Sequence, residues 1–215
     1  MRTRIKICGL TREVDVDAAV AAGVDAIGLV LYAHSPRAVS LERAAVLARR
    51  LPAFVTPVAL FVNATRAEVE AACAALPAVL LQFHGDEMPT DCASYGRPYV
   101  RAARMTRGFD LLDFARQYAD AQGLVLDAHV QGYGGGGKVF DWSLVPHGVP
   151  HRLVLSGGLN AVNVTDGMVK VRPWAVDVSS GVESAKGIKD AAAIRRFCQV
   201  VREADARIAA HAPTS

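Results

Sequence analysis

The chain has 215 residues, of which 52% are hydrophobic and 21% are charged, which excludes a disordered chain and suits a single folded domain. The formal net charge is only +3, and the basic residues are scattered without interleaved aromatic residues, so the sequence does not support nucleic-acid binding. No apolar stretch is long enough for a signal peptide or a membrane span, so we expect a cytoplasmic protein with no membrane partner.

Short apolar runs rich in β-branched residues alternate with longer, Ala-rich stretches along the chain. We expect strands at Arg4–Cys8, Ala26–Leu31, Pro57–Val62, Val79–Phe83, Pro98–Ala102, Gly123–Asp127, Arg152–Ser156 and Ala175–Val178. We expect helices at Arg12–Ala22, Leu41–Arg50, Arg66–Ala75, Leu111–Ala119, Ala161–Val169 and Asp190–Ile208, with short ones near Pro89–Ser94 and Trp142–Val145. The candidate N-caps are Thr11, Ser40 and Thr65, the last with Glu68 three residues later as in a capping box.

Strands that alternate with helices predict parallel pairing through βαβ crossovers. Eight such units close a barrel, so we predict an α/β fold, a single (βα)8 TIM barrel over residues 1–215, with a frayed tail at about 209–215. The count depends on Pro98–Ala102, and without that strand an open, doubly wound sheet is the alternative.

Glycine-rich loops follow the sixth, seventh and eighth predicted strands, at the end of the barrel where TIM-barrel active sites lie. Backbone N–H groups in such loops can converge on phosphate oxygens, so we predict a phosphate site there. For any single glycine pair, a tight turn that needs positive φ is the alternative. The predicted phosphate-binding residues are Gly135, Gly136, Gly137, Gly157, Gly158, Ser180 and Gly181.

Cys8 ends the first predicted strand. Period-two alternation places Lys6 and Cys8 on one face, and we expect Ile5 and Ile7 on the other face to pack against the helices. A thiolate can act as a general base, and Lys6 could lower the pKa of this thiol. From the residues alone, an inert buried cysteine is an equally good interpretation.

The other three cysteines, Cys73, Cys92 and Cys198, are expected to be structural. The sequence contains no CxxC pair and no histidine cluster at metal-ligand spacing, so we predict no metal site. Free thiols favour a reducing compartment.

Asp127 ends the sixth predicted strand, after an apolar run. A carboxyl group at the mouth of an apolar barrel can hold a proton and act as a general acid, with a helix cap or a salt bridge as the alternatives. The planar guanidinium of Arg37 suits a substrate carboxylate, with a solvated surface arginine as the alternative. His84 and Asp177 could orient substrate hydroxyls or Lys6, or could be satisfied polar residues of the barrel.

Taken together, these segments resemble the phosphoribosylanthranilate isomerase family of tryptophan biosynthesis, in family order from Lys6 to Glu183. The matching segments are Lys6-Ile-Cys-Gly9, Ser35-Pro-Arg37, Gln82-Phe-His-Gly85, Leu126-Asp127, Gly134 to Lys138 with Phe140-Asp-Trp142, Leu155-Ser-Gly-Gly-Leu159 and Asp177-Val-Ser-Ser-Gly-Val-Glu183. Gly136 departs from the family's usual Thr or Ser, so one hydroxyl contact to phosphate is in doubt. Phe83 in place of Leu and Ala161 in place of Pro remove no proposed catalytic group.

The resemblance implies an isomerase that carries out the Amadori rearrangement of N-(5-phosphoribosyl)anthranilate to 1-(2-carboxyphenylamino)-1-deoxyribulose 5-phosphate. It assigns Asp127 as general acid and Cys8 as general base, and Arg37 would hold the anthranilate carboxylate. His84 and Asp177 complete the predicted substrate-binding residues. Both steps are proton transfers, so no metal or redox cofactor is expected. The expected partner is a small phosphorylated aminosugar, and both a monomer and a homodimer remain open.

Two alternative functions remain open. The first is another phosphosugar barrel enzyme, such as an epimerase or the related isomerase of histidine biosynthesis. The histidine-pathway enzyme resembles this barrel but uses two aspartates, whereas Cys8 occupies the first position here. A non-catalytic phosphate-binding module would bind a phosphosugar but would not need Cys8 and Asp127 together.

Overall fold

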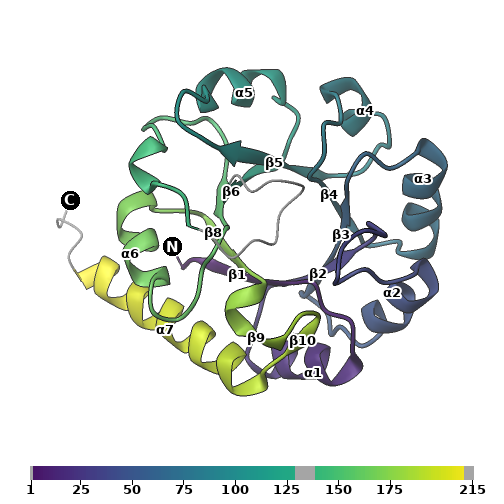
Figure 1. Cartoon of the computed structure of the whole chain (residues 1–215), viewed down its shortest axis with the longest axis horizontal. Coiled ribbons are helices and arrows are strands. Elements are labelled where there is room, and N and C mark those ends of the chain that lie inside the picture. Colours follow the sequence, from purple (N-terminus) through teal and green to yellow (C-terminus); the bar gives the residue numbers. More distant parts are fainter. Residues whose placement is uncertain (1, 129–138, 211–215) are drawn as a thin grey trace.

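The chain forms a closed barrel of eight parallel strands surrounded by helices, viewed down the barrel in Figure 1. The computed structural model describes residues 2–128 and 139–210. In ring order the strands are β1 (Arg4–Cys8), β2 (Ala26–Val30), β3 (Thr56–Phe61), β4 (Leu80–Phe83), β5 (Tyr99–Met105), β6 (Gly123–Ala128), β7 (Leu153–Leu155) and β8 (Ala175–Val178). Since β8 pairs with β1, the ring closes and the predicted (βα)8 barrel is confirmed. The fifth strand, on which the predicted count depends, is present as β5 and is longer than predicted.

The outer layer consists of α1 (Glu13–Ala21), α2 (Leu41–Ala48), α3 (Arg66–Ala75), α4 (Pro89–Ala93), α5 (Leu111–Gln117), the 3-10 helix η1 (Trp142–Leu144), α6 (Val164–Val171) and α7 (Ala191–Ala210). The helix predicted to begin at Ala161 starts three residues later, at Val164. The last helix continues through Ala210, past the predicted start of a frayed tail, and residues 211–215 lie outside the described residues.

Two of the three predicted N-caps are confirmed. The Ser40 side chain accepts from the backbone N–H of Arg43, and Thr65 forms a capping box with Glu68. The prediction for Thr11 is wrong, because its hydroxyl donates instead to the backbone carbonyl of Gly187 and the helix begins after Arg12.

Apolar side chains fill two separate layers. Ile5 and Ile7 belong to the large core between the strands and the helices, as predicted. A smaller cluster comprises Val100, Ala102, Val125, Val154 and Ala175, several of which are direct neighbours on adjacent strands. On β6 and β8, the residues two positions further along the same face are acidic, so this small cluster forms the floor beneath the polar end of the barrel.

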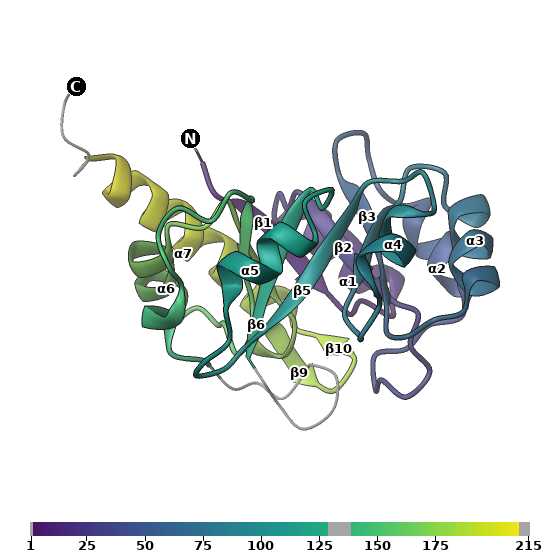
Figure 2. The same cartoon turned by 90° about the horizontal axis from the view of Figure 1, so that it is seen from above.

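A 3-10 helix and a hairpin that the sequence did not predict follow β8. They are η2 (Ser180–Val182), β9 (Glu183–Ala185) and β10 (Ile188–Lys189), with Gly187 at φ +77° in the hairpin. Figure 2 shows the hairpin at the end of the barrel opposite the chain's N-terminus. It therefore adds side chains to the end where the strands finish.

Among the residues that the structure describes, none of the helices combines the length and the apolar character needed to span a bilayer.

Candidate active site

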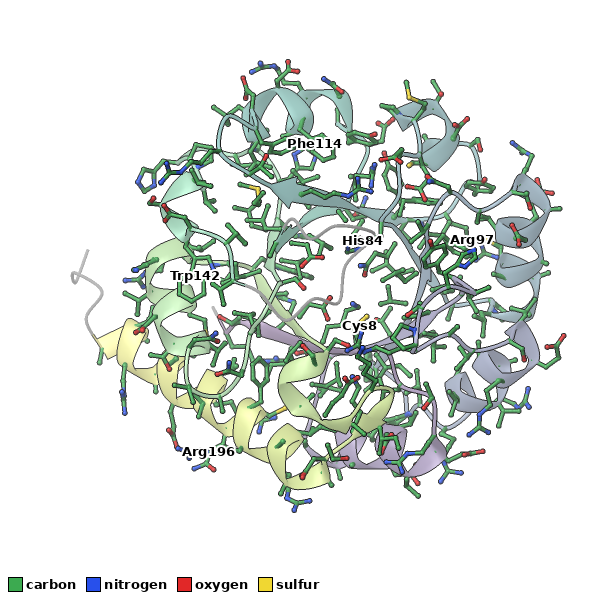
Figure 3. The ribbon with its side chains drawn as sticks, in the orientation of Figure 1. Cys8, His84, Arg97, Phe114, Trp142 and Arg196 are labelled. Carbon is green, nitrogen blue, oxygen red and sulfur yellow. The ribbon has the colours of Figure 1, made fainter. Side chains whose placement is uncertain are left out.

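Four of the predicted site residues gather inside one end of the barrel. Cys8 ends β1, His84 directly follows β4, and Asp127 and Asp177 lie near the ends of β6 and β8. All four are buried, and Figure 3 shows Cys8 and His84 inside the ring of strands. The predicted phosphate ligands Gly135, Gly136 and Gly137 lie outside the described residues.

Lys6 links Cys8 to Asp177. Its Nζ lies 2.7 Å from Asp177 Oδ2, and the two residues are paired in register across β1 and β8. Burial by itself would lower the pKa of Lys6, but the Asp177 charge and the neighbouring Cys8 outweigh it and the pKa is raised. Lys6 therefore stays cationic beside the thiol. The second oxygen of Asp177, Oδ1, is buried without a hydrogen-bond partner among the described residues.

The thiol of Cys8 is subject to opposing influences. Burial raises its pKa, the positive charges of Lys6 and Lys189 lower it, and the charge of Asp177 raises it. The net shift is upward, so Lys6 acts in the predicted direction but burial is the larger effect on the pKa of Cys8.

Within the described part of the chain, two hydrogen bonds hold Asp127. Its Oδ1 accepts from the backbone N–H of Ala128 at 2.9 Å, and its Oδ2 lies 3.0 Å from His84 Nε2. The Nδ1 atom of His84 lies 3.2 Å from Nε2 of Gln82, a β4 residue that is only 1% exposed. Both nitrogens of His84 are thus occupied, and His84 contacts Asp127 instead of Lys6.

Two glycines leave room for the proposed acid and base. Gly28 is paired with Cys8 in register, and a Cβ atom at Gly28 would lie 2.6 Å from Cys8 Sγ. Gly157 has φ +78°, and a Cβ atom there would lie 2.9 Å from Asp127 Oδ1. Any side chain at either position would displace a reactive group.

Arg37 is buried and paired within the protein. Its Nε and Nη2 atoms bond to the two carboxylate oxygens of Glu183 at 2.7 and 2.8 Å. Lys189 Nζ contacts the same carboxylate at 2.8 Å and also donates to the backbone carbonyl of Ser179. Burial would raise the pKa of Glu183, but Arg37 and Lys189 outweigh it and the pKa is lowered. A solvated surface arginine, the alternative for Arg37, is therefore excluded.

The loops after β7 and β8 lie against each other. Gly157 and Gly158 both have positive φ, as the tight-turn alternative requires. Gly181 is in η2, where a Cβ atom would clash with the backbone carbonyl of Leu159. The predicted phosphate residues Gly157, Gly158, Ser180 and Gly181 thus lie in adjoining loops, and their phosphate contact stays a prediction.

Nowhere in residues 2–128 and 139–210 do three or more His, Cys, Asp or Glu side chains gather in a way that could hold a metal ion.

The arrangement matches a known family. A protein-family model described as N-(5'phosphoribosyl)anthranilate (PRA) isomerase matches residues 5–200 of the chain. A curated protein named N-(5'-phosphoribosyl)anthranilate isomerase, from Methylibium petroleiphilum, is 76% identical over 210 residues and covers 98% of this chain and 99% of that protein. The chain belongs to the phosphoribosylanthranilate isomerase family.

Solved structures of phosphoribosylanthranilate isomerases share the fold. The one from Thermotoga maritima superposes with a TM-score of 0.86 at 37% identity and covers 94% of this chain and 99% of its own. Another, described as a complex with reduced 1-(o-carboxyphenylamino)-1-deoxyribulose 5-phosphate, has a TM-score of 0.81 at 34% identity, with 94% and 99% coverage. The resemblance inferred from the motifs is therefore confirmed.

Sequence reasoning missed four residues of this isomerase barrel. Glu183 was part of a motif but had no role, and Lys189 belongs to a hairpin that was not predicted. Gly28 interrupts an otherwise apolar strand, which is a sign of close backbone approach. Gln82 is a polar residue in a short apolar strand, two positions before His84 and so on the same face.

Proposed function

We propose that this chain catalyses the Amadori rearrangement of N-(5-phosphoribosyl)anthranilate to 1-(2-carboxyphenylamino)-1-deoxyribulose 5-phosphate in tryptophan biosynthesis. The observation that carries the proposal is the presence of two buried proton-transfer groups at one end of the barrel. Cys8 has a cationic neighbour in Lys6, and Asp127 is hydrogen-bonded to His84. One group can serve as base and the other as acid.

Asp127 acts as the general acid in the first step. It gives a proton to the furanose ring oxygen, and the bond from C1′ to that oxygen breaks with its electrons going to oxygen. The lone pair of the anilino nitrogen then forms the C1′=N bond of an iminium ion. The two hydrogen bonds to the carboxyl group support this role, since they fix its orientation inside the barrel.

Cys8 acts as the general base in the second step. Its thiolate removes the proton from C2′, the C–H electrons form the C1′=C2′ bond, and the iminium electrons return to nitrogen. The enolamine then loses its hydroxyl proton and gains one at C1′, which gives the ketone with no net change in protons. The position of Lys6 supports this role, because a cation beside a thiol favours the thiolate.

Arg37 is proposed to bind the anthranilate carboxylate. Glu183 occupies Nε and Nη2, so Nη1 is the atom that we propose for this contact. Asp177 is proposed to accept a substrate hydroxyl through Oδ1, which has no partner among the described residues. A substrate contact of His84 remains a prediction as well.

The loops after β6, β7 and β8 are proposed to hold the substrate phosphate, through Gly135, Gly136 and Gly137 and through Gly157, Gly158, Ser180 and Gly181. The expected partner is a small phosphorylated aminosugar, and the protein itself is expected to be a monomer or a homodimer. The described cysteines are free thiols, which supports the expected cytoplasmic location, since reducing compartments keep thiols unpaired.

The proposal is tested by expressing the chain in two bacterial strains. One lacks phosphoribosylanthranilate isomerase and requires tryptophan, and the other lacks the related isomerase of histidine biosynthesis and requires histidine. We expect growth without tryptophan in the first strain and no growth without histidine in the second. Failure to restore growth in the first strain, with folded protein present, would refute the proposed function.

A further inference from the structure

Gln82 is a buried polar side chain that the mechanism above does not use. It is 1% exposed, and it shares the inner face of β4 with Leu80, which packs against the apolar floor of the barrel. Its amide Nε2 lies 3.2 Å from His84 Nδ1, while its Oε1 has no hydrogen-bond partner among the described residues. The hydrogen bond to His84 is therefore the contact through which Gln82 can affect the site.

The chemistry of the amide fixes which nitrogen of His84 carries the proton. In the orientation that the structure gives the amide, its nitrogen faces Nδ1, and because an amide nitrogen can only donate, Nδ1 accepts and carries no proton of its own. The proton of a neutral imidazole is then on Nε2, which donates to Asp127 Oδ2. A charged imidazolium would need a second proton on Nδ1, and that proton would face the N–H of Gln82.

This restriction bears on Asp127. An ordinary imidazole is a stronger base than an ordinary carboxylate, so a histidine beside an aspartate normally takes the proton and forms an ion pair. From the described residues, each oxygen of Asp127 accepts one hydrogen bond, and a carboxylate oxygen has a second lone pair on which a proton can sit. Because Nδ1 of His84 faces the N–H of Gln82, a proton that reaches His84 and Asp127 binds to the Asp127 carboxylate.

We propose that Gln82 is a positioning residue that keeps His84 neutral, with its proton on Nε2, and thereby keeps the acidic proton on Asp127. This inference rests on the proposed function, in which Asp127 donates that proton to the ring oxygen. In this role Gln82 acts through its hydrogen bond to His84.

Two substitutions test the inference through turnover. Gln82→Glu places an acceptor at Nδ1, which stabilises the imidazolium and moves the proton from Asp127 to His84. We expect kcat to fall about 10²-fold with little change in KM, since the loss is one of acid catalysis. Gln82→Met, of similar length but without the amide, should cause a smaller loss of about 10-fold. Equal losses in the two variants, or a loss confined to KM, would overturn the inference.

The double variant Gln82→Glu/Asp127→Asn separates this role from a structural one. If Gln82 acts through Asp127, the double variant should turn over within about twofold of Asp127→Asn alone. If Gln82 only supports the barrel, the two losses should multiply, which would contradict the inference.

A spectroscopic measurement on the wild type tests the inference even if the Gln82→Glu variant fails to fold. Long-range ¹H–¹⁵N spectra distinguish protonated from unprotonated ring nitrogens, and His84 is assigned among the six histidines by its absence in His84→Gln. We expect Nδ1 of His84 to be unprotonated and Nε2 to carry the proton. A protonated Nδ1 would overturn the inference, and this result does not depend on whether the chain turns over the proposed substrate.

Discussion

Replacing Gly28 with alanine would place a methyl group against the proposed base. The new Cβ atom would lie 2.6 Å from Cys8 Sγ and 3.0 Å from Cys8 Cα. Ordinary contacts between such atoms are about 3.5–4.0 Å, so the two residues must separate by about 1 Å. Because β1 and β2 are paired in register at this point, the backbone cannot open locally, and the thiol has to move.

A displacement of about 1 Å at a reacting group costs about 10²-fold in rate. We therefore expect Gly28→Ala to lower kcat by about 10²-fold, with a smaller change in KM. Overpacking should also lower the free energy of unfolding by about 1–3 kcal/mol. The assays are steady-state kinetics with phosphoribosylanthranilate generated in situ and urea denaturation.

Ala102→Val is the matched control for this prediction. It also adds methyl groups inside the barrel, but within the apolar floor formed with Val100 and Val125. We expect a similar loss of stability and a kcat close to that of the wild type. The reasoning is refuted if Gly28→Ala keeps its kcat, or if the two variants lose activity to the same extent.

Further predictions concern two of the buried ion pairs, Lys6–Asp177 and Arg37–Glu183. The double variant Lys6→Met/Asp177→Asn removes the charges of Lys6 and Asp177. Because Lys6 lowers the pKa of the Cys8 thiol more than Asp177 raises it, the pKa of Cys8 should rise. The limb of the kcat/KM profile that reports Cys8 should then move to higher pH, and a shift of that limb to lower pH would contradict its assignment to Cys8. Arg37→Ala should raise KM and lower the free energy of unfolding by about 3 kcal/mol, because Glu183 loses a buried partner. Unchanged KM would exclude the carboxylate role, and urea denaturation measures the second effect.

Much of the fold could be predicted because the strands follow local rules. Alternation along β1 placed Ile5 and Ile7 against the helices and Lys6 and Cys8 inside, as the structure has them. The β9–β10 hairpin was missed because its two strands have three and two residues, too few to show alternation.

The site could be predicted as a set of strand-end residues but not as a set of contacts. Cys8 and Asp127 were recognisable from their positions at the ends of strands. Their partners depend on the order of strands around the ring, which places His84 of the β4 end against Asp127 of β6. Arg37 and Glu183 are 146 positions apart in the sequence, so no local pattern predicts their ion pair.

The most direct test of the account is the fluorescence-monitored loss of phosphoribosylanthranilate, generated in situ, with wild type and Cys8→Ala side by side. Circular dichroism checks the folding of both proteins. Replacement of the buried Cys8 side chain by the methyl group of alanine should leave the barrel intact. The account predicts fast loss with the wild type and a rate at least about 10²-fold lower with the variant. Near-normal turnover by a folded Cys8→Ala protein would contradict it, because the base would then have to be another group.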